Sequence, residues 1–119
     1  CVIRDDAADI VEKMKNADVL AFATPIYYYE MSGQMKTMLD RANPLFPAEY
    51  AFRDIYLLTA AAEDGDDVWR RAAEGLQGWI ACFPKARLAG VIFGGDAAAE
   101  KAVVGSPSVF KAYDAGCAL

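Results

Sequence analysis

The stretch Thr24-Pro25-Ile26-Tyr27-Tyr28-Tyr29-Glu30-Met31-Ser32-Gly33 lies between two segments of different pattern. An apolar run, residues 19–23, precedes it, and a helical pattern, residues 34–41, follows it. We therefore predict a loop that joins a buried strand to a helix. Loops usually face water and are small and polar, whereas this loop holds three consecutive tyrosines. These aromatic rings indicate a surface covered by a flat ligand, and the alternatives are rings that cap the core at a strand end or that pack at a subunit interface.

The composition describes one domain, residues 1–119, with a single core. The net charge of -5 argues against nucleic acid or an anionic membrane as partner, because phosphate groups would repel the protein. No apolar run approaches the ~20 residues that span a bilayer, and no signal peptide is predicted. There is no histidine, so the commonest general base and metal ligand is missing. We therefore expect any catalysis to use a cofactor.

The chain contains three widely spaced cysteines, Cys1, Cys82 and Cys117. An odd number at such spacing does not indicate a disulfide framework, so we expect free thiols and a reducing cytoplasm.

Three apolar runs alternate with helical patterns along the chain. We predict strands over residues 18–23, 55–59 and 88–93, each followed by a helical pattern. The first run shows no alternation, which is typical of a strand buried on both faces of a parallel sheet. Helices are expected over residues 6–15, 33–42, 66–83, 97–104 and 109–115. The fold class is therefore α/β, with a parallel sheet and right-handed crossovers.

Several acidic and glycine-rich segments have a structural and a functional interpretation. Asp6 fits the N-cap of the first helix, and Asp66 or Asp67 fits that of the helix after the second strand. A metal or phosphoacceptor pocket at Asp5-Asp6 and a cation site in residues 63–67 are the less favoured alternatives. Gly94-Gly95 could bind phosphate, but a tight turn is favoured because the fuller glycine fingerprint is absent.

The tyrosine loop and the small-residue loop after the second strand both follow carboxyl ends of predicted parallel strands. These ends meet at one edge of the sheet, where ligands of open α/β sheets bind. We therefore expect residues 24–33 and 60–63 to lie at the same edge.

The combination of Asp5-Asp6, the Thr24-Pro25-Ile26-Tyr27 loop and the helix from Met31 to Arg41 resembles the NAD(P)H-dependent FMN reductase family. This flavodoxin-like group also includes the iron-sulfur flavoproteins. The resemblance implies a flavodoxin-like parallel sheet with helices on both faces, N-terminally truncated. The members' first strand, phosphate-binding loop, first helix and second strand have no counterpart in these residues. Cys1 matches the last cysteine of a cysteine-rich linker, and one cysteine alone cannot hold an iron-sulfur cluster.

The resemblance further implies FMN as the cofactor, with its ring held between the two loops and the redox chemistry supplied by the flavin. No residue is expected to be catalytic, and no metal ligand is expected. By position, the cofactor-binding candidates are Thr24, Pro25, Ile26, Tyr27, Tyr28, Met31, Ser32, Ala60, Ala61 and Ala62, with Tyr29 and Gly33 as weaker ones. Lys36, Asp40 and Arg41 are interpreted as structural, with Lys36 and Asp40 paired on one helix face.

The elements that are absent affect both the site and the sheet. The ring loops lie in this chain, whereas the phosphate cradle would lie in the absent segment. Loss of the first strand would also expose an edge along residues 19–23, which must be paired or covered. We therefore expect a homo-oligomer, to which residues 46–52 could contribute, or a complementing N-terminal segment.

The predicted function is an FMN-dependent oxidoreductase that takes hydride from NAD(P)H and passes electrons to a quinone, a flavin or another small acceptor. Two alternatives stay open at this point. One is an electron carrier of flavodoxin type, and the other is a flavin-free interaction or assembly module.

Overall fold

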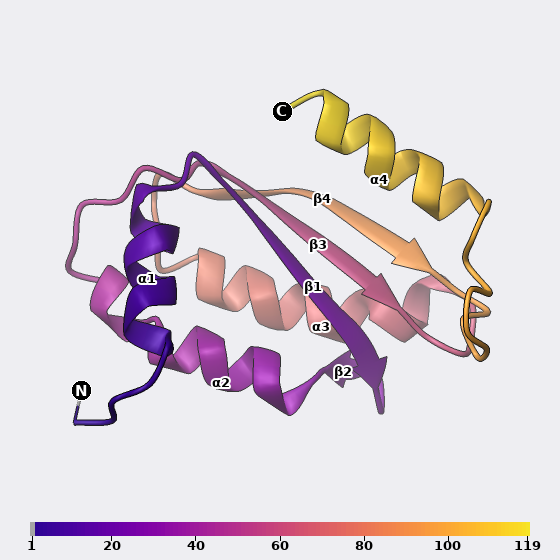
Figure 1. The fold of residues 1–119 in the computed structure, drawn as a ribbon, viewed down its shortest axis with the longest axis horizontal. Helices are drawn as coiled ribbons and strands as arrows, with labels where there is room; N and C mark the ends of the chain where they lie inside the picture. Colours follow the sequence, from indigo (N-terminus) through magenta and orange to yellow (C-terminus); the bar gives the residue numbers. More distant parts are fainter. Residues whose placement is uncertain (1) are drawn as a thin grey trace.

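The computed structural model describes residues 2–119, and Cys1, with the thiol predicted for it, lies outside the described residues. Helices and strands alternate along most of the chain (Figure 1). The elements are α1 (Ala7–Asn16), β1 (Val19–Tyr27), β2 (Glu30–Met31), α2 (Gly33–Arg41), the 3-10 helix η1 (Asn43–Leu45), β3 (Asp54–Ala60), α3 (Asp66–Ile80), β4 (Arg87–Gly94) and α4 (Pro107–Cys117).

The sheet has the strand order β2-β1-β3-β4. Strands β1, β3 and β4 are parallel, with Phe22 opposite Leu57 and Leu57 opposite Val91. This confirms the predicted α/β class. The sheet is nevertheless mixed, because β1 continues to Tyr27 and β2 returns antiparallel beside its last two residues.

Helices cover both faces of the sheet, but unequally. Helices α1, α2 and α3 lie on one face, and α4 lies on the other (Figure 1). The core lies between the sheet and the first three helices, and its largest fully buried side chains are Leu45, Phe52, Ile55, Leu57 and Leu76. Helix α4 has no buried residue and packs mainly along β4.

This unequal cover corrects the prediction that the first strand is buried on both faces. Burial alternates along β1, with Leu20, Phe22, Thr24 and Ile26 buried and the residues between them largely exposed. The reason is that α4, the one helix on the second face within residues 2–119, packs on β4 and leaves β1 uncovered. Strand β1 therefore carries apolar side chains on both faces of the sheet, but within residues 2–119 helices cover it on only one of these faces.

The second edge of β1 is open, as predicted. Strand β2 pairs only with Ile26 and Tyr27, so residues 19–24 have no strand beside them on that edge in the described part of the chain. Unpaired backbone N–H and C=O groups along such an edge form a template for another strand.

Two helix starts differ from the prediction. Asp6 occupies the N-cap position of α1, as predicted, but its side chain makes no capping bond, and Asp5 accepts the Ala7 N–H at 3.1 Å instead. Asp5 is fixed there because its two carboxylate oxygens each lie 2.7 Å from a nitrogen of the Arg41 guanidinium. The N-cap of helix α3 is Gly65, whose φ of 124° is strained for any residue with a side chain. Asp66 and Asp67 therefore do not cap the helix but lie in its first turn.

Residues 97–104 form turns and not the predicted helix. Lys101 and Gly105 have positive φ values of 64° and 78°, which interrupt any regular helical run. The last helix begins at Pro107, where a missing N–H costs nothing because the first helical N–H groups are unpaired anyway.

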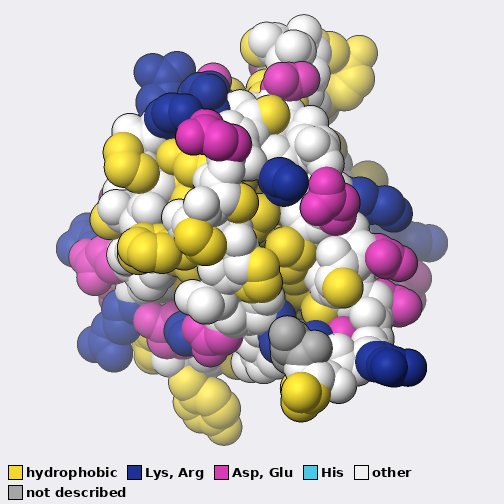
Figure 2. Space-filling model, turned by 90° about the vertical axis from the view of Figure 1, so that its left-hand side faces the viewer, with side chains coloured by type: hydrophobic (Ala, Val, Ile, Leu, Met, Phe, Trp, Pro, Cys, Tyr) yellow, Lys and Arg dark blue, Asp and Glu magenta, His cyan; other side chains and the backbone are white. Residues whose placement is uncertain are grey.

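The surface at the amino-terminal ends of the strands mixes apolar side chains with a border of charged ones (Figure 2). Phe46, just after η1, is 63% exposed. Cys82 and Cys117 are free and exposed. No helix within residues 2–119 is long and apolar enough to cross a membrane.

We expect Gly78→Ala to raise the free energy of unfolding by about 0.5–1 kcal/mol, because alanine restricts the unfolded chain and suits a helix better. Gly78 lies in α3, and a Cβ there would meet no atom within 4 Å. A urea titration with an unchanged slope measures the gain. Gly75→Ala is the control, since its Cβ would lie 3.3 Å from the Met31 methyl and part of the gain is lost. An equal or larger gain at Gly75 would contradict this packing argument.

Candidate functional site

The two predicted loops lie together at the carboxyl-terminal edge of the sheet (Figure 1). The first is a tight hairpin, β1–β2, and not the irregular loop that the sequence predicts. Tyr27 pairs with Glu30, and Tyr28 and Tyr29 form the two-residue turn. The second follows β3 and contains Ala61, Ala62 and Glu63.

The hairpin turn holds two tyrosines in the left-handed region. The φ values are 51° for Tyr28 and 66° for Tyr29. Two-residue hairpins with both central φ values positive usually carry Asn-Gly, and each non-glycine residue in this conformation costs about 1–2 kcal/mol. This conformation pushes the Tyr28 side chain outward, where it is 98% exposed, and Tyr27 is 60% exposed.

A buried set of hydroxyl groups fixes the base of the hairpin. The Thr24 Oγ1 accepts the Ser32 N–H at 2.9 Å, and the Thr59 hydroxyl donates to the Thr24 carbonyl at 2.7 Å. Ser32 is the N-cap of α2, and its Oγ accepts the Met35 N–H at 3.3 Å. All three hydroxyl residues are less than a tenth exposed. Thr24 therefore joins the end of β1, the end of β3 and the start of α2.

The loops after β3 and β4 are also joined. The Ala61 N–H donates to the Gly94 carbonyl at 3.1 Å, and the Ala61 carbonyl accepts the Ala97 N–H at 2.8 Å. A Cβ on Gly95 would collide with the Asp64 side chain. The tight turn predicted at Gly94-Gly95 is wrong in position, because Gly94 is the last residue of β4 and pairs with Ala60, and the chain bends at Asp96, whose φ is 55°.

A cleft of about 200 Å³ separates the hairpin from the loop after β3. It is lined by Ile26, Tyr28, Tyr29, Ala61, Ala62, Glu63 and Val68. The Tyr29 hydroxyl donates to the Glu63 carboxylate across it at 3.0 Å. This bond raises the pKa of Tyr29, the charges of Glu63 and Asp67 raise it further, and the Arg71 charge opposes them. Tyr29 therefore keeps its proton.

The predicted cofactor-binding residues fall into two groups in space. The side chains of Thr24, Ile26, Met31 and Ser32 are buried and support the loop from below. Pro25, Tyr27, Tyr28 and Ala62 are exposed, and Ala60 and Ala61 are half-buried. Of the predicted residues, Ile26, Tyr28, Ala61 and Ala62 line the cleft, whereas Thr24, Pro25 and Ala60 line a separate groove between the sheet and α4.

Glu63, Tyr29 and Val68 line the cleft, yet the sequence gives them little or no weight as site residues. Glu63 follows Ala62 directly, but it opens the acidic segment that is interpreted as a solvated turn. Its proximity to the small-residue loop was the available signal. Across residues 2–119, no three His, Cys, Asp or Glu side chains are grouped so as to hold a metal ion.

The charged residues of α2 form ion pairs, including the predicted pair of Lys36 and Asp40. The Lys36 ammonium lies 2.6 Å from the Asp40 carboxylate on the same helix face. Arg41 pairs with Asp5 and so joins α2 to the start of α1.

The three parallel strands with helices on both faces place the chain in the flavodoxin-like class of α/β folds. Among solved structures, the Trp repressor binding protein from Bacillus subtilis has a similar fold. The TM-score is 0.63 at 21% identity, over 76% of this chain and 62% of that one.

The sequence profile of the NADPH-dependent FMN reductase family matches residues 1–99. The chain belongs to this family, as its resemblance predicts, and FMN, the predicted cofactor, is the flavin that the family's description names.

Curated relatives are similar over parts of the chain. An iron-sulfur flavoprotein from Methanocaldococcus jannaschii is 42% identical over 45 residues, which is 38% of this chain and 23% of the relative. One from Archaeoglobus fulgidus is 35% identical over 68 residues, 57% of this chain and 35% of the relative. A putative NAD(P)H-dependent FMN-containing oxidoreductase from Bacillus subtilis is 40% identical over 50 residues, 38% of this chain and 28% of the relative. The matches thus span about a quarter to a third of these relatives.

Proposed function

We propose that this chain carries the ring-binding part of an FMN-dependent NAD(P)H oxidoreductase. The observation that carries the proposal is the hairpin of exposed tyrosines, which stands beside a small-residue loop at the carboxyl edge of a parallel sheet. Flat aromatic surface at this edge suits an isoalloxazine ring. Membership of the FMN reductase family supports the same cofactor.

The residues present fit the ring. Tyr27 and Tyr28 offer exposed aromatic surface, and Ala61 and Ala62 offer small apolar surface in the same cleft as Tyr28. Bound FMN would supply the redox chemistry, by accepting hydride from NAD(P)H and releasing electrons to a quinone, a free flavin or another small acceptor. The chain's own contribution is to hold and orient the ring and to exclude water from its covered face.

The residues present do not fit the phosphate equally well. The chain has a net charge of -5, and four of its acidic residues, Glu63 and Asp64 in the loop after β3 and Asp66 and Asp67 in the first turn of α3, lie near the same edge. A phosphate dianion would be repelled there unless several backbone N–H groups surrounded it. We propose that a complementing segment supplies this cradle.

The open edge of β1 and the uncovered sheet face indicate where such a segment would bind. A groove of about 430 Å³ lies between that face and α4, with Ala23, Leu58, Ile92 and Val109 among its lining residues. A strand paired along residues 19–24, followed by a helix in this groove, would cover both. Right-handed crossovers require a strand that precedes α1 to lie on this side of β1.

The finer parts of the proposal rest on the family and on general chemistry. These are the use of NAD(P)H, a small electron acceptor, and a reducing cytoplasm, for which free Cys82 and Cys117 are typical. A homo-oligomer, with the exposed Phe46 at its interface, is the alternative to a complementing segment.

We expect the 119-residue chain to bind riboflavin and FMN with dissociation constants within about threefold of each other. The reason is that the ring is held here, whereas a site that grips the phosphate with charged hydrogen bonds would favour FMN by about 1.5–3 kcal/mol per bond, which is tenfold or more. Flavin fluorescence quenching measures both constants. A preference for FMN above about thirtyfold would mean that this chain already contains a phosphate cradle.

Reduction of the bound flavin distinguishes the enzyme from an electron carrier. In anaerobic stopped flow, NADPH should bleach the flavin band of the protein–flavin complex, and a complex that dithionite bleaches but NADPH does not would favour the carrier. The open edge and the groove favour a third candidate, a flavin-free assembly module. Protein that stays colourless after incubation with FMN and that elutes as a stable oligomer would support that candidate.

A further inference from the structure

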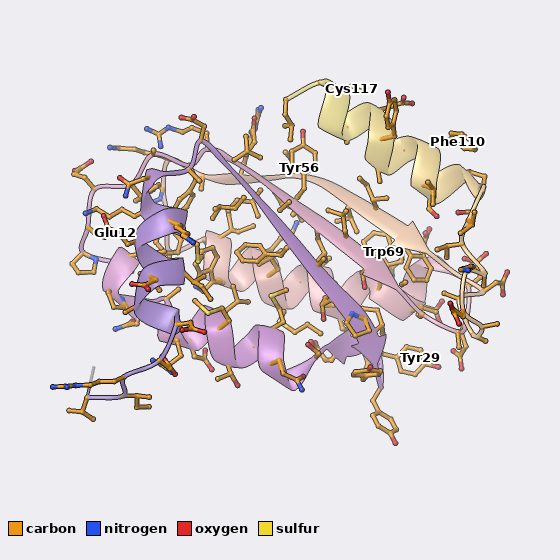
Figure 3. All side chains as sticks on the ribbon, viewed as in Figure 1. Glu12, Tyr29, Tyr56, Trp69, Phe110 and Cys117 are labelled. Carbon is orange, nitrogen blue, oxygen red and sulfur yellow. The ribbon has the colours of Figure 1, made fainter. Side chains whose placement is uncertain are left out.

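The tip of the hairpin is attached to the loop after β3 by one side-chain contact. The Tyr29 hydroxyl donates to the Glu63 carboxylate at 3.0 Å, which joins residues 34 positions apart in the chain. The labelled Tyr29 in Figure 3 extends from the hairpin at the carboxyl end of β1. Both residues line the cleft between the two loops.

A third side chain places Tyr29 from the other side. The Arg71 guanidinium of α3 lies 6.0 Å from the centre of the Tyr29 ring, within the range of a cation–π contact. Tyr29 is accordingly only 41% exposed, whereas its neighbour Tyr28 is 98% exposed. The two adjacent tyrosines therefore differ: one is held by two elements, and the other is free to face a ligand.

The backbone explains why the contact is needed. Tyr28 and Tyr29 both have positive φ, a conformation that persists in non-glycine residues only where surrounding contacts compensate for it. Thr24 fixes the base of the hairpin, but it lies several residues from the tip. At the tip itself, the side-chain contacts that can compensate for the positive φ values are those of Tyr29 with Glu63 and Arg71.

We infer that Tyr29 and Glu63 are positioning residues, whose hydrogen bond sets the width of the flavin cleft by holding the hairpin tip against the loop after β3. The inference rests on the proposed function for the identity of the ligand. Glu63 then acts by positioning the hairpin and not by contact with the flavin ring. The bond also places a carboxylate at the cleft, so that an electron added to a bound flavin would be repelled by Glu63 while the hairpin is closed.

The first test needs no flavin. In the apo chain, Tyr29→Phe should speed amide hydrogen exchange of the paired residues Tyr27 and Glu30 by roughly three- to tenfold, because loss of one hydrogen bond favours local opening of the hairpin. The matched control is Tyr113→Phe, which removes the hydroxyl of a tyrosine that is 71% exposed on α4. Unchanged exchange in Tyr29→Phe, or an equal change in the control, would overturn the inference.

The second test follows ionisation. A difference titration at the tyrosinate absorbance band, wild type minus Tyr29→Phe, should give a pKa above that of free tyrosine. In Glu63→Gln this pKa should fall, because the carboxylate that favours the protonated form is gone, while Asp67 and Arg71 still face the ring with opposing effects. Glu49→Gln, which removes an ion pair with Lys85, should leave the titration unchanged. A Tyr29 titration that is insensitive to Glu63→Gln would exclude the bond.

The third test uses bound flavin. Tyr29→Phe should weaken flavin binding several-fold, and Glu63→Gln should also raise the flavin midpoint potential, whereas Glu49→Gln should change neither. If wild type binds no flavin, the proposed function fails, and the exchange and titration experiments still decide whether the Tyr29–Glu63 bond holds the hairpin tip. If wild type binds flavin and both variants match it, this bond has no part in the site and the inference is wrong.

Discussion

Phe52→Ala is expected to lower the free energy of unfolding by about 3–5 kcal/mol, a large part of the 5–15 kcal/mol that holds a typical domain. Phe52 is fully buried in the segment that leads into β3. Its ring stacks on Tyr50 at 4.4 Å between centroids and lies 5.4 Å from Phe83 and 6.3 Å from Trp79. These rigid rings cannot close over the space that the substitution leaves, so the cavity cost is added to the lost burial.

Urea unfolding followed by tryptophan fluorescence measures this loss, since Trp79 is a direct neighbour of the deleted ring. Phe46→Ala is the matched control. Phe46 belongs to the same connection but is 63% exposed, and its removal should cost less than about 1 kcal/mol. Similar losses of unfolding free energy in the two variants would mean that the aromatic cluster around Phe52 does not form the core at the amino-terminal edge of the sheet. Because the cluster lies at the amino-terminal edge, flavin binding per folded molecule should be unchanged in Phe52→Ala.

Much of the fold follows from apolar runs and helical spacing. The three parallel strands and the helix that follows the second of them, α3, are where the sequence predicts them. Helix starts were less predictable, because the sequence predicts Asp6 as the capping side chain of α1, whereas Asp5 makes the bond to the Ala7 N–H. The choice between them depends on Arg41, a residue 36 positions away. Tertiary contacts of this kind leave no local pattern.

The position of the site was predictable, but the direction of its side chains was not. The sequence ends the first strand at Ala23, whereas β1 continues through Pro25 to Tyr27. Strand alternation then points Thr24 and Ile26 into the core and Pro25 and Tyr27 outward. A proline interrupts most strands, and it is tolerated here because β1 is an edge strand at that position. The hairpin was also hidden, since Tyr-Tyr is not a residue pair that indicates a two-residue turn.

Thr24→Val is expected to lower the free energy of unfolding by about 1–3 kcal/mol, because valine keeps the shape of threonine but leaves the Ser32 N–H without an acceptor. That N–H is bonded to the Thr24 hydroxyl at 2.9 Å in a buried environment. The loss falls at the junction of β1 and α2, so the whole hairpin should loosen and flavin affinity should fall with stability. Hydrogen exchange at the Ser32 amide, measured beside urea unfolding, locates the effect.

Two further substitutions separate the hydroxyl from the rest of the side chain. Thr24→Ser keeps the acceptor and loses one methyl group, so it should cost less than Thr24→Val and should retain slow exchange at Ser32. Thr37→Val removes an exposed hydroxyl that donates to the Gly33 carbonyl on α2, and its effect should stay within about 0.5 kcal/mol. Equal losses in Thr24→Ser and Thr24→Val would assign the effect to packing. Thr24 would then have no role in closing the base of the flavin hairpin through its hydroxyl.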